Sequence, residues 1–300
     1  MITGPDGLHG ARGSCETIFA SYYLVRFQFA CGSATVWGVS TLDPNREIYP
    51  HAPLKLVTFE LRCAPFELPT ATVEGFVSAL QEPYPVRGPA VQHLVLGPGG
   101  PASVVGARLF DRERRESVML ESQRLAFETA RYRRFEELRA SVAELVNVLQ
   151  SLDLVVAPVR VGLRYIDEID EALLPEPRDW MRYIAPALAS PLEHFDPPPL
   201  EHQSAALFEG SEGQNVVLRY GLMRQPAVDP TGPLVIDAPP QGRYFLIDID
   251  SAWQGEAEAT PLADWLLPKL DDLHAPIRRL FETAITEELR NEVLREGSDV

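Results

Sequence analysis

The hydrophobic pattern first becomes regular over residues 54–62, where apolar and polar side chains alternate. Strict alternation with one strongly apolar face predicts a β-strand. Apolar residues then recur at helical spacing over residues 72–82, with Thr70 or Thr72 as the expected N-cap and Pro83 as the expected end. The regular part of the chain therefore begins with a strand followed by a helix.

A run of further strands follows this first strand and helix. Short apolar or alternating stretches that are bounded by turn-rich or charged segments predict strands. They cover residues 91–96, 104–111, 116–121 and 123–128. A long helix is expected next, because apolar residues recur at steps of three and four and form one stripe. That stripe consists of Phe135, Leu138, Val142, Leu145, Val146 and Leu149.

The same order of elements then begins again. A long strand is predicted over residues 155–169, and a short helix over about 180–188. Further strands follow near residues 203–209, 214–222 and 243–250. A final long helix over residues 265–281 is expected to kink if Pro268 and Pro276 lie inside it.

Strand, helix, several strands and a long helix thus occur twice, at about residues 53–152 and 155–295. Consecutive strands that are joined by short turns favour antiparallel pairing. The sequence therefore predicts an α+β fold with a mainly antiparallel sheet, long packing helices and a duplicated strand-helix-strands-helix unit. We expect residues 48–152 and 153–300 to be two α+β halves of one continuous structural unit.

Residues 1–47 differ from the rest of the chain. They are glycine-rich at the start and sparse in charge, and their apolar stretch over 18–37 has no clean period. We interpret this segment as a poorly structured N-terminal extension, or as upstream sequence that a wrongly chosen start codon has included. We expect no function there.

Composition indicates an ordinary globular protein, with 45% hydrophobic and 23% charged residues. The sequence has neither a run of about 18 apolar residues nor a secretory signal pattern, so we expect a cytoplasmic protein without a membrane partner. A net charge of −16 argues against nucleic-acid binding, which depends on Lys and Arg that neutralise phosphates. Nearly all the positive charge is Arg, with Lys only at Lys55 and Lys269.

Familiar catalytic signatures are absent from the sequence. Cys15, Cys31 and Cys63 lack metal-ligand spacing and predict free thiols in a reducing compartment. The sequence also lacks a phosphate-binding loop, a dinucleotide fingerprint, a His-Glu-x-x-His motif and a nucleophile elbow. We therefore expect no cofactor, and the sequence leans away from an enzyme.

Asp248 and Asp250 are the strongest candidates for chemistry. Their i, i+2 spacing on a strand places both carboxylates on one face, where oxygen ligands hold a divalent cation. The alternative is a solvent-facing alternation with Ile247 and Ile249 buried behind it. In the first interpretation the side chain of Asp248 binds a cation, and in the second it faces solvent.

Two further polar groups are candidates for a binding role. Arg164, Asp167 and Asp170 lie on or just after a strand, where an Arg–carboxylate contact is either a structural ion pair or part of a site. His274 lies near the apolar stripe of the last helix, with Glu282 two turns further along. A buried helix histidine is the simpler interpretation, and a base or ligand that converges with Asp248 and Asp250 is the other.

Several short segments occur in an order that resembles a sporadically distributed prokaryotic family of uncharacterised proteins, known under a "sporadTIGR" label. They are residues 52–54, 57–62, 81–82, 84–85, 161–167, 273–274, 277, 280–282 and 285–286. The resemblance covers roughly 53–295 and implies one continuous unit, with residues 1–47 outside it. The family pattern has Asn where this chain has Asp167, and the resemblance supplies no catalytic residue.

These observations favour a non-catalytic cytosolic protein that works through a surface for a protein partner or for self-association. A full amphipathic core and the absence of catalytic motifs support this expectation. The rival is a metal-dependent hydrolase or nuclease that uses Asp248, Asp250 and His274. A third hypothesis is a small-ligand sensor in a pocket between two similar halves.

Overall fold

The computed structural model describes residues 47–64, 68–89, 91–97, 100–170, 174, 176–210, 212–237, 242–255 and 262–296. The predictions for residues 1–46, including those for Cys15 and Cys31, lie outside these ranges. None of the helices in the described residues is both long enough and apolar enough to cross a bilayer.

Each half contains a strand, a helix, several strands and a long helix, in the order that the sequence predicts. The first half contains β1 (Leu54–Cys63), α1 (Thr70–Ala79), β2 (Val86–Arg87), β3 (Val91–Gly97), β4 (Gly100–Phe110), β5 (Glu116–Glu121), β6 (Arg124–Thr129) and α2 (Phe135–Ser151). The second contains β7 (Pro158–Asp170), the 3₁₀-helix η1 (Pro177–Arg182), α3 (Pro186–His194), β8 (Ser204–Glu209), β9 (Gln214–Met223), β10 (Tyr244–Gln254), α4 (Leu262–Ala284), α5 (Glu287–Leu289) and the π-helix η2 (Arg290–Arg295).

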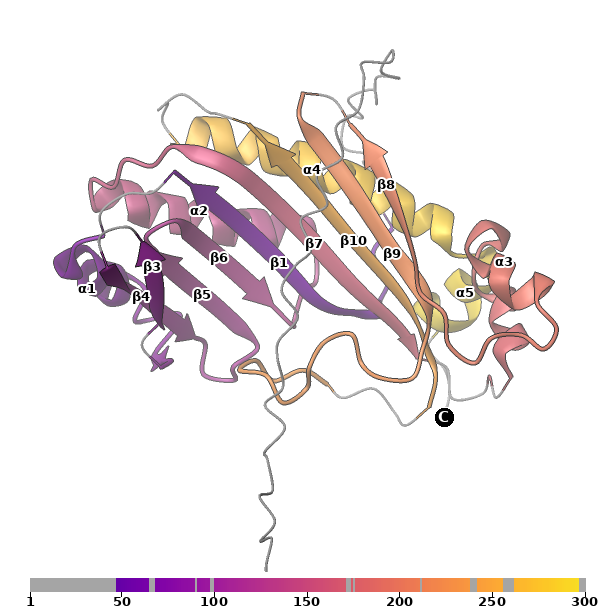
Figure 1. Cartoon of the computed structure of the whole chain (residues 1–300). Coiled ribbons are helices and arrows are strands. Elements are labelled where there is room, and N and C mark those ends of the chain that lie inside the picture. Colours follow the sequence, from indigo (N-terminus) through magenta and orange to yellow (C-terminus); the bar gives the residue numbers. More distant parts are fainter. Residues whose placement is uncertain are drawn as a thin grey trace, which may run out of the picture. The chain divides into compact units, whose positions relative to one another are not determined.

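The described strands form one antiparallel sheet in the order β2-β4-β5-β6-β1-β7-β10-β9-β8, with β3 paired to β4 (Figure 1). The predicted α+β class with mainly antiparallel pairing is therefore confirmed. The duplicated order of elements is also present. β1 and β7 pair with each other at the centre, and the last strand before each long helix, β6 or β10, returns to pair with the first strand of its own half.

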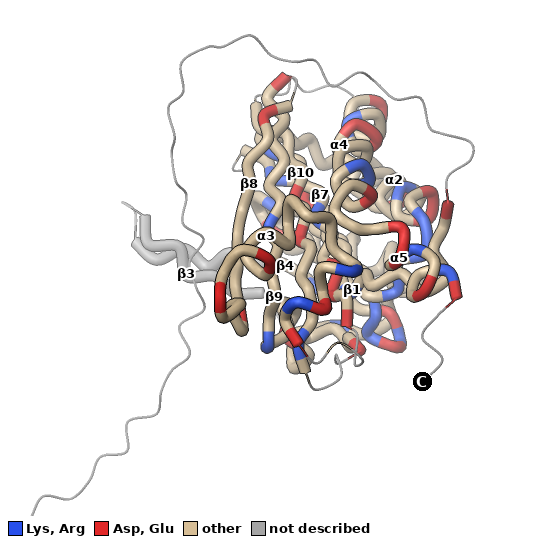
Figure 2. Tube along the Cα trace, turned by 90° about the vertical axis from the view of Figure 1, so that its right-hand side faces the viewer, with Lys and Arg blue, Asp and Glu red and all other residues tan. Residues whose placement is uncertain are grey.

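The helices cover one face of this sheet, which we call the helix face. Figure 2 shows α2 and α4 together on one side of the strands. Alternate residues of the central strands point into this layer, where Phe59, Leu163, Ile247 and Ile249 are fully buried. Arg139 on α2 donates to Asp271 on α4 at 2.8 Å and joins the two helices.

The opposite face of the sheet, which we call the open face, has no helix over it in Figures 1 and 2. Residues 224–237, which we call the strap, cross one end of this face and pack Val228 and Ile236 against Ile166, Leu246 and neighbouring apolar residues. The strap is orange and runs below β1 and β5 in Figure 1. It leaves the rest of the open face uncovered by described elements.

The short helix predicted near residues 180–188 is two helices. Ala185 precedes Pro186 and is extended, with φ −53° and ψ 139°, because the residue before proline is driven from the helical region. The chain therefore breaks between η1 and α3. Pro268 and Pro276 do lie inside α4, as the sequence allowed.

The predicted boundaries of α1 are wrong at both ends. The helix begins at Thr70 with Pro69 as its N-cap residue, so neither predicted threonine caps it. It ends at Ala79, and Leu80 leaves the helical region to reach the core. The helix therefore stops before Pro83 can terminate it.

Candidate functional site

The sequence-predicted candidates separate onto the two faces of the sheet. Asp248 alternates with Ile247 and Ile249, which lie in the core, so its side chain is on the open face. Arg164 lies on the same face of the neighbouring strand β7 and contacts Asp248. Asp250 shares this face because it is two residues further along β10.

Asp248 is held by two arginines. Arg164 donates from Nε and Nη2 to its two carboxylate oxygens, each at 2.7 Å, and Arg219 on β9 donates at 3.3 Å. A two-pronged contact of this kind fixes the planar guanidinium and is stronger than a neutral hydrogen bond. Asp248 is therefore an anchor for arginines on both neighbouring strands, and its oxygens are engaged by cations.

A second carboxylate, Glu60 on β1, is held by three arginines. Arg124, Arg62 and Arg160 stand side by side in cross-strand register on β6, β1 and β7. All three contact Glu60, at 2.6, 2.8 and 2.8 Å respectively. Arg160 also reaches Asp250 at 3.5 Å, so the Glu60 cluster approaches the Asp248 cluster.

Together these arginines form what we call the arginine array, which consists of Arg62, Arg124, Arg160, Arg164 and Arg219. Their side chains are 20–53% exposed, whereas Glu60 is 10% and Asp248 is 3% exposed. The arginines thus lie nearer the solvent than the two carboxylates that hold them. Five arginines contact three carboxylates, so the array itself carries more positive than negative charge.

Gly162 provides the space in which Arg160 lies. A Cβ atom at this position would collide with the guanidinium of Arg160, whose alternate-residue spacing puts it on the same face of β7. The absent side chain lets Arg160 extend over the backbone toward Glu60. The Arg160-x-Gly162-x-Arg164 spacing is therefore part of the array.

Two carboxyl groups beside the arginine array, Glu60 and Asp250, have pKa values that are shifted in opposite directions. Burial opposes ionisation of Glu60, but Arg124, Arg62 and Arg160 outweigh it and hold the pKa of this carboxyl below its ordinary value. Burial raises the pKa of Asp250, and the surrounding arginines only partly oppose this effect. Glu60 is consequently the firmly ionised centre of the row.

Asp167 lies on the helix face and does not join Arg164. Ile166 beside it packs against the strap, so Asp167 points the other way and is 5% exposed. Burial, together with the charge of Asp248, raises its pKa well above the ordinary value. The predicted cluster of Arg164, Asp167 and Asp170 is therefore wrong, and Asp170 contacts Lys55 instead, at 3.3 Å.

His274 also lies on the helix side of the sheet. Its ring stacks on Phe135 of α2 with 3.9 Å between centroids and 4° between planes, and Tyr165 lies 6.0 Å away. The sheet separates His274 from Asp248 and Asp250, so the three residues do not converge. No three His, Cys, Asp or Glu side chains in the described ranges are grouped to hold a metal ion.

Cys63 is buried at the end of β1, where burial raises the pKa of its thiol to about 12. A thiol with this pKa is almost wholly protonated at neutral pH and is a poor nucleophile. The position of Cys63 therefore gives it a role in the core.

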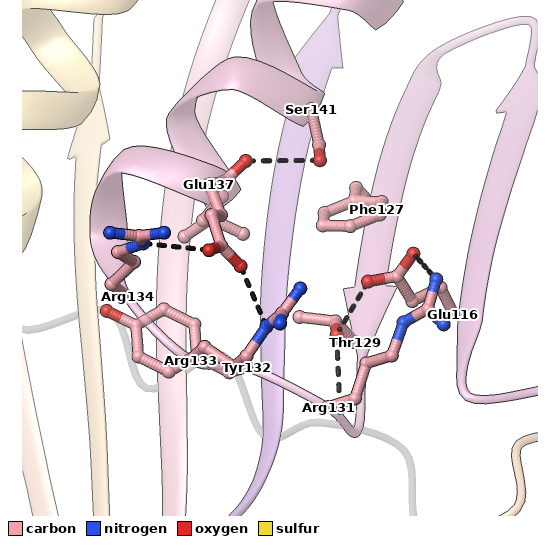
Figure 3. Close-up of a pocket in the computed structure, with 10 residues that line it drawn as sticks. Glu116, Phe127, Thr129, Arg131, Tyr132, Arg133, Arg134, Glu137 and Ser141 are labelled. Carbon is pink, nitrogen blue, oxygen red and sulfur yellow. Dashed lines mark hydrogen bonds and ion pairs between the residues drawn. The ribbon is translucent and has the colours of Figure 1, made fainter. Parts of the chain in front are cut away.

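A small pocket lies where β6 leads into α2 (Figure 3). Its free volume is about 30 Å³, which suits on the order of one water molecule. Figure 3 shows Glu137 between Arg133 and Arg134, with contacts of 3.1 and 2.7 Å, and Glu116 beside Arg131 at 2.8 Å. The pocket's arginines contact its own carboxylates, and its volume is too small for a ligand much larger than a water molecule.

Sequence reasoning missed Glu60, Arg62, Arg124, Arg160 and Arg219. The i, i+2 pairs Glu60/Arg62 and Arg160/Gly162 were visible as one-face patterns, but nothing in a single sequence aligns β1 with a strand 100 residues away. No protein-family model matches the chain, and no curated protein sequence matches it. The resemblance to the sporadTIGR family therefore stays a prediction.

Proposed function

We propose that this protein is a non-catalytic binding protein whose arginine array docks an acidic segment of a partner protein. The observation that carries the proposal is the layering of charge on the open face. Buried Glu60 and Asp248 fix the arginines from below, and the guanidinium groups form the layer that a partner meets. In a protein of net charge −16, these five arginines gather on one face of the sheet.

The geometry of the arginines suits carboxylates. Each guanidinium has five N–H donors in a rigid plane, and the contacts with Glu60 and Asp248 use at most two of them on Arg62, Arg124 and Arg219. The remaining donors are oriented without loss of side-chain entropy on binding, because the buried carboxylates already restrict the arginines. An acidic segment gains contacts here without having to order the surface.

Two features favour an acidic protein segment over a nucleic acid. The large negative charge of the whole chain repels a long phosphate backbone, whereas a short segment meets only the local positive layer. Binding to single-stranded nucleic acid also relies on exposed aromatic rings. Among the described residues the exposed large apolar side chains include one aromatic ring, that of Phe195, which follows α3 and is not on a strand of the sheet.

The direct test is the binding of a labelled poly-glutamate peptide to the full chain at neutral pH, measured by fluorescence anisotropy. We expect saturable binding that weakens as salt is added, because the outer arginines are exposed to screening. The double variant Arg62→Gln, Arg124→Gln is expected to bind about tenfold more weakly. These two side chains are the outermost members of the row, so the core remains intact.

The matched control is Arg133→Gln, Arg134→Gln, which removes two exposed arginines at the start of α2. It changes the net charge by the same amount and is expected to leave peptide binding unaltered. Equal losses in the two double variants, or no binding at low salt, would overturn the proposal. Tighter binding of an oligonucleotide of the same charge would reassign the array to nucleic acid.

We further propose that the protein works in the cytoplasm, as the sequence predicts. This location is consistent with the buried free thiol of Cys63. The metal-dependent rival draws no support from the site, because its three residues lie on opposite sides of the sheet.

A further inference from the structure

One edge of the sheet ends in β8, a strand whose one charged residue is Glu209 at its end. β8 is last in the strand order, and no described strand pairs with its outer side. An edge strand presents backbone N–H and C=O groups to any strand that approaches. The other end of the sheet differs, because β2 is only two residues long and is flanked by Pro85 and Pro89.

The sequence of β8 favours pairing of this edge with another strand. Its six residues, Ser-Ala-Ala-Leu-Phe-Glu, contain no Lys, Pro or Gly, and residues 203–208 carry no charge. Natural edges are commonly protected by charge, proline or a bulge. Leu207 instead projects from the open face with 60% of its surface exposed.

Exposed apolar residues also gather in the chain segment that leads into β8. Phe195, Leu200 and Leu207 are three of the seven exposed large hydrophobic residues in the described chain, and they lie within residues 195–207. Scattered single apolar residues need no explanation, but a concentration in the segment that leads into an edge strand, whose outer side no described strand pairs with, indicates an interface.

We propose that two copies of this chain pair antiparallel through β8, with Leu207 on the two-fold axis. A two-fold axis perpendicular to the sheet keeps the helix faces of both copies on the same side. In such a pairing the numbers of any two opposite residues add to the same even total. Centring on Leu207 places Ala206 opposite Phe208 of the second copy and Ala205 opposite Glu209, so each small side chain faces a large one.

A second copy fits this edge better than a charged partner. The net charge of −16 makes two copies repel at a distance, but the uncharged stretch over residues 203–208 places no like charges in direct contact. The pairing continues the sheet and buries Leu207 against its counterpart. The arginine row on β6, β1 and β7 is at least three strands away and stays accessible in the dimer, whereas Arg219 of the array lies on β9 next to the pairing edge.

Sedimentation velocity of the full chain over a range of concentrations tests the pairing. We expect a monomer–dimer equilibrium that Leu207→Lys weakens at least tenfold, because two like charges then oppose each other on the axis. Val155→Lys is the matched control, since Val155 is 78% exposed and precedes β7, three strands away. A monomer at every concentration, or a dimer that tolerates Leu207→Lys, overturns the proposal.

Cross-linking with a short bismaleimide tests the register. Leu207→Cys places two thiols next to each other across the axis and is expected to give a covalent dimer. Ala205→Cys is the control, because its counterpart lies four residues along the antiparallel strand. Equal cross-linking of both variants, or none with Leu207→Cys, contradicts a register centred on Leu207.

Discussion

Replacing Glu60 by Gln removes the charge that three arginines share. Arg124, Arg62 and Arg160 are aligned across neighbouring strands, and like charges directly opposite each other are destabilising. The Gln side chain retains the shape and one acceptor oxygen, so the change isolates the charge. We expect a less stable protein whose fold is unaltered.

The magnitude follows from the exposure of each partner. Contacts with charged groups contribute about 1.5–3 kcal/mol when buried and about 0.2–1 kcal/mol when exposed. Glu60 is 10% exposed, while its partners range from Arg160 at 20% to Arg62 at 53%. Arg160 therefore contributes most and Arg62 least, and we expect a total loss of about 2–3 kcal/mol.

The loss of stability in Glu60→Gln must change with pH in one direction. The pKa of Glu60 is lowered in the folded protein, so its ionised form contributes stability above the ordinary carboxyl pKa of about 4.3. This contribution disappears as the pH falls through the lower folded pKa. The difference between wild type and Glu60→Gln is therefore largest at neutral pH and vanishes in strong acid.

Urea unfolding followed by tryptophan fluorescence at neutral and acidic pH measures both effects. Glu74→Gln is the matched control, because Glu74 makes an exposed pair with Arg87 at 2.9 Å. We expect no measurable change in its unfolding midpoint. A Glu60→Gln protein as stable as wild type at neutral pH would refute the reasoning that the arginine row depends on a buried counter-charge.

Three further substitutions test other parts of the structure. Asp167→Asn removes a buried carboxyl whose pKa is raised. The stability of this variant relative to wild type should therefore increase as the pH rises, and the stabilities of the two proteins should converge below about pH 4. Unfolding measured at several pH values tests this expectation. A gain that is constant with pH would contradict this account. Gly221→Ala should destabilise more than Gly242→Ala in thermal unfolding, because both have positive φ but only at Gly221 would a Cβ meet the carbonyl oxygen of His202. Equal losses of stability in the two variants would show that the contact between a Cβ atom and the His202 carbonyl does not matter at Gly221. Gly162→Ala should displace Arg160 from Glu60, so it should weaken poly-glutamate binding and lower the melting temperature, and unchanged binding would remove Arg160 from the docking surface.

The elements of the fold were predictable because each of them follows a local period. The alternation over β1 and the stripe along α2 are set by residues within one element, so a single sequence contains them. The break at Pro186 was also local, since proline restricts the residue before it. The order of strands in the sheet was not local, and neither was the pairing of β1 with β7.

Part of the site was readable and was grouped wrongly. Arg164 and Asp167 are three residues apart on one strand, and odd spacing already places two side chains on opposite faces. Asp248 lies between Ile247 and Ile249, so burial of the isoleucines under α4 turns Asp248 away from His274. Alternation alone therefore argued against the predicted clusters once the strands were assigned.

The arginine row could not be assembled in the same way, because it joins the two halves of the chain. Glu60 belongs to the first half and Arg160 to the second, and they meet at 2.8 Å only because β1 and β7 pair at the centre of the sheet. Arg160 then reaches Asp250 within its own half. Separated halves would leave Glu60 and Asp250 without this shared arginine. The surface that we propose for partner binding thus exists only where both halves fold together, which is why the predicted single unit and the predicted partner surface depend on the same contact.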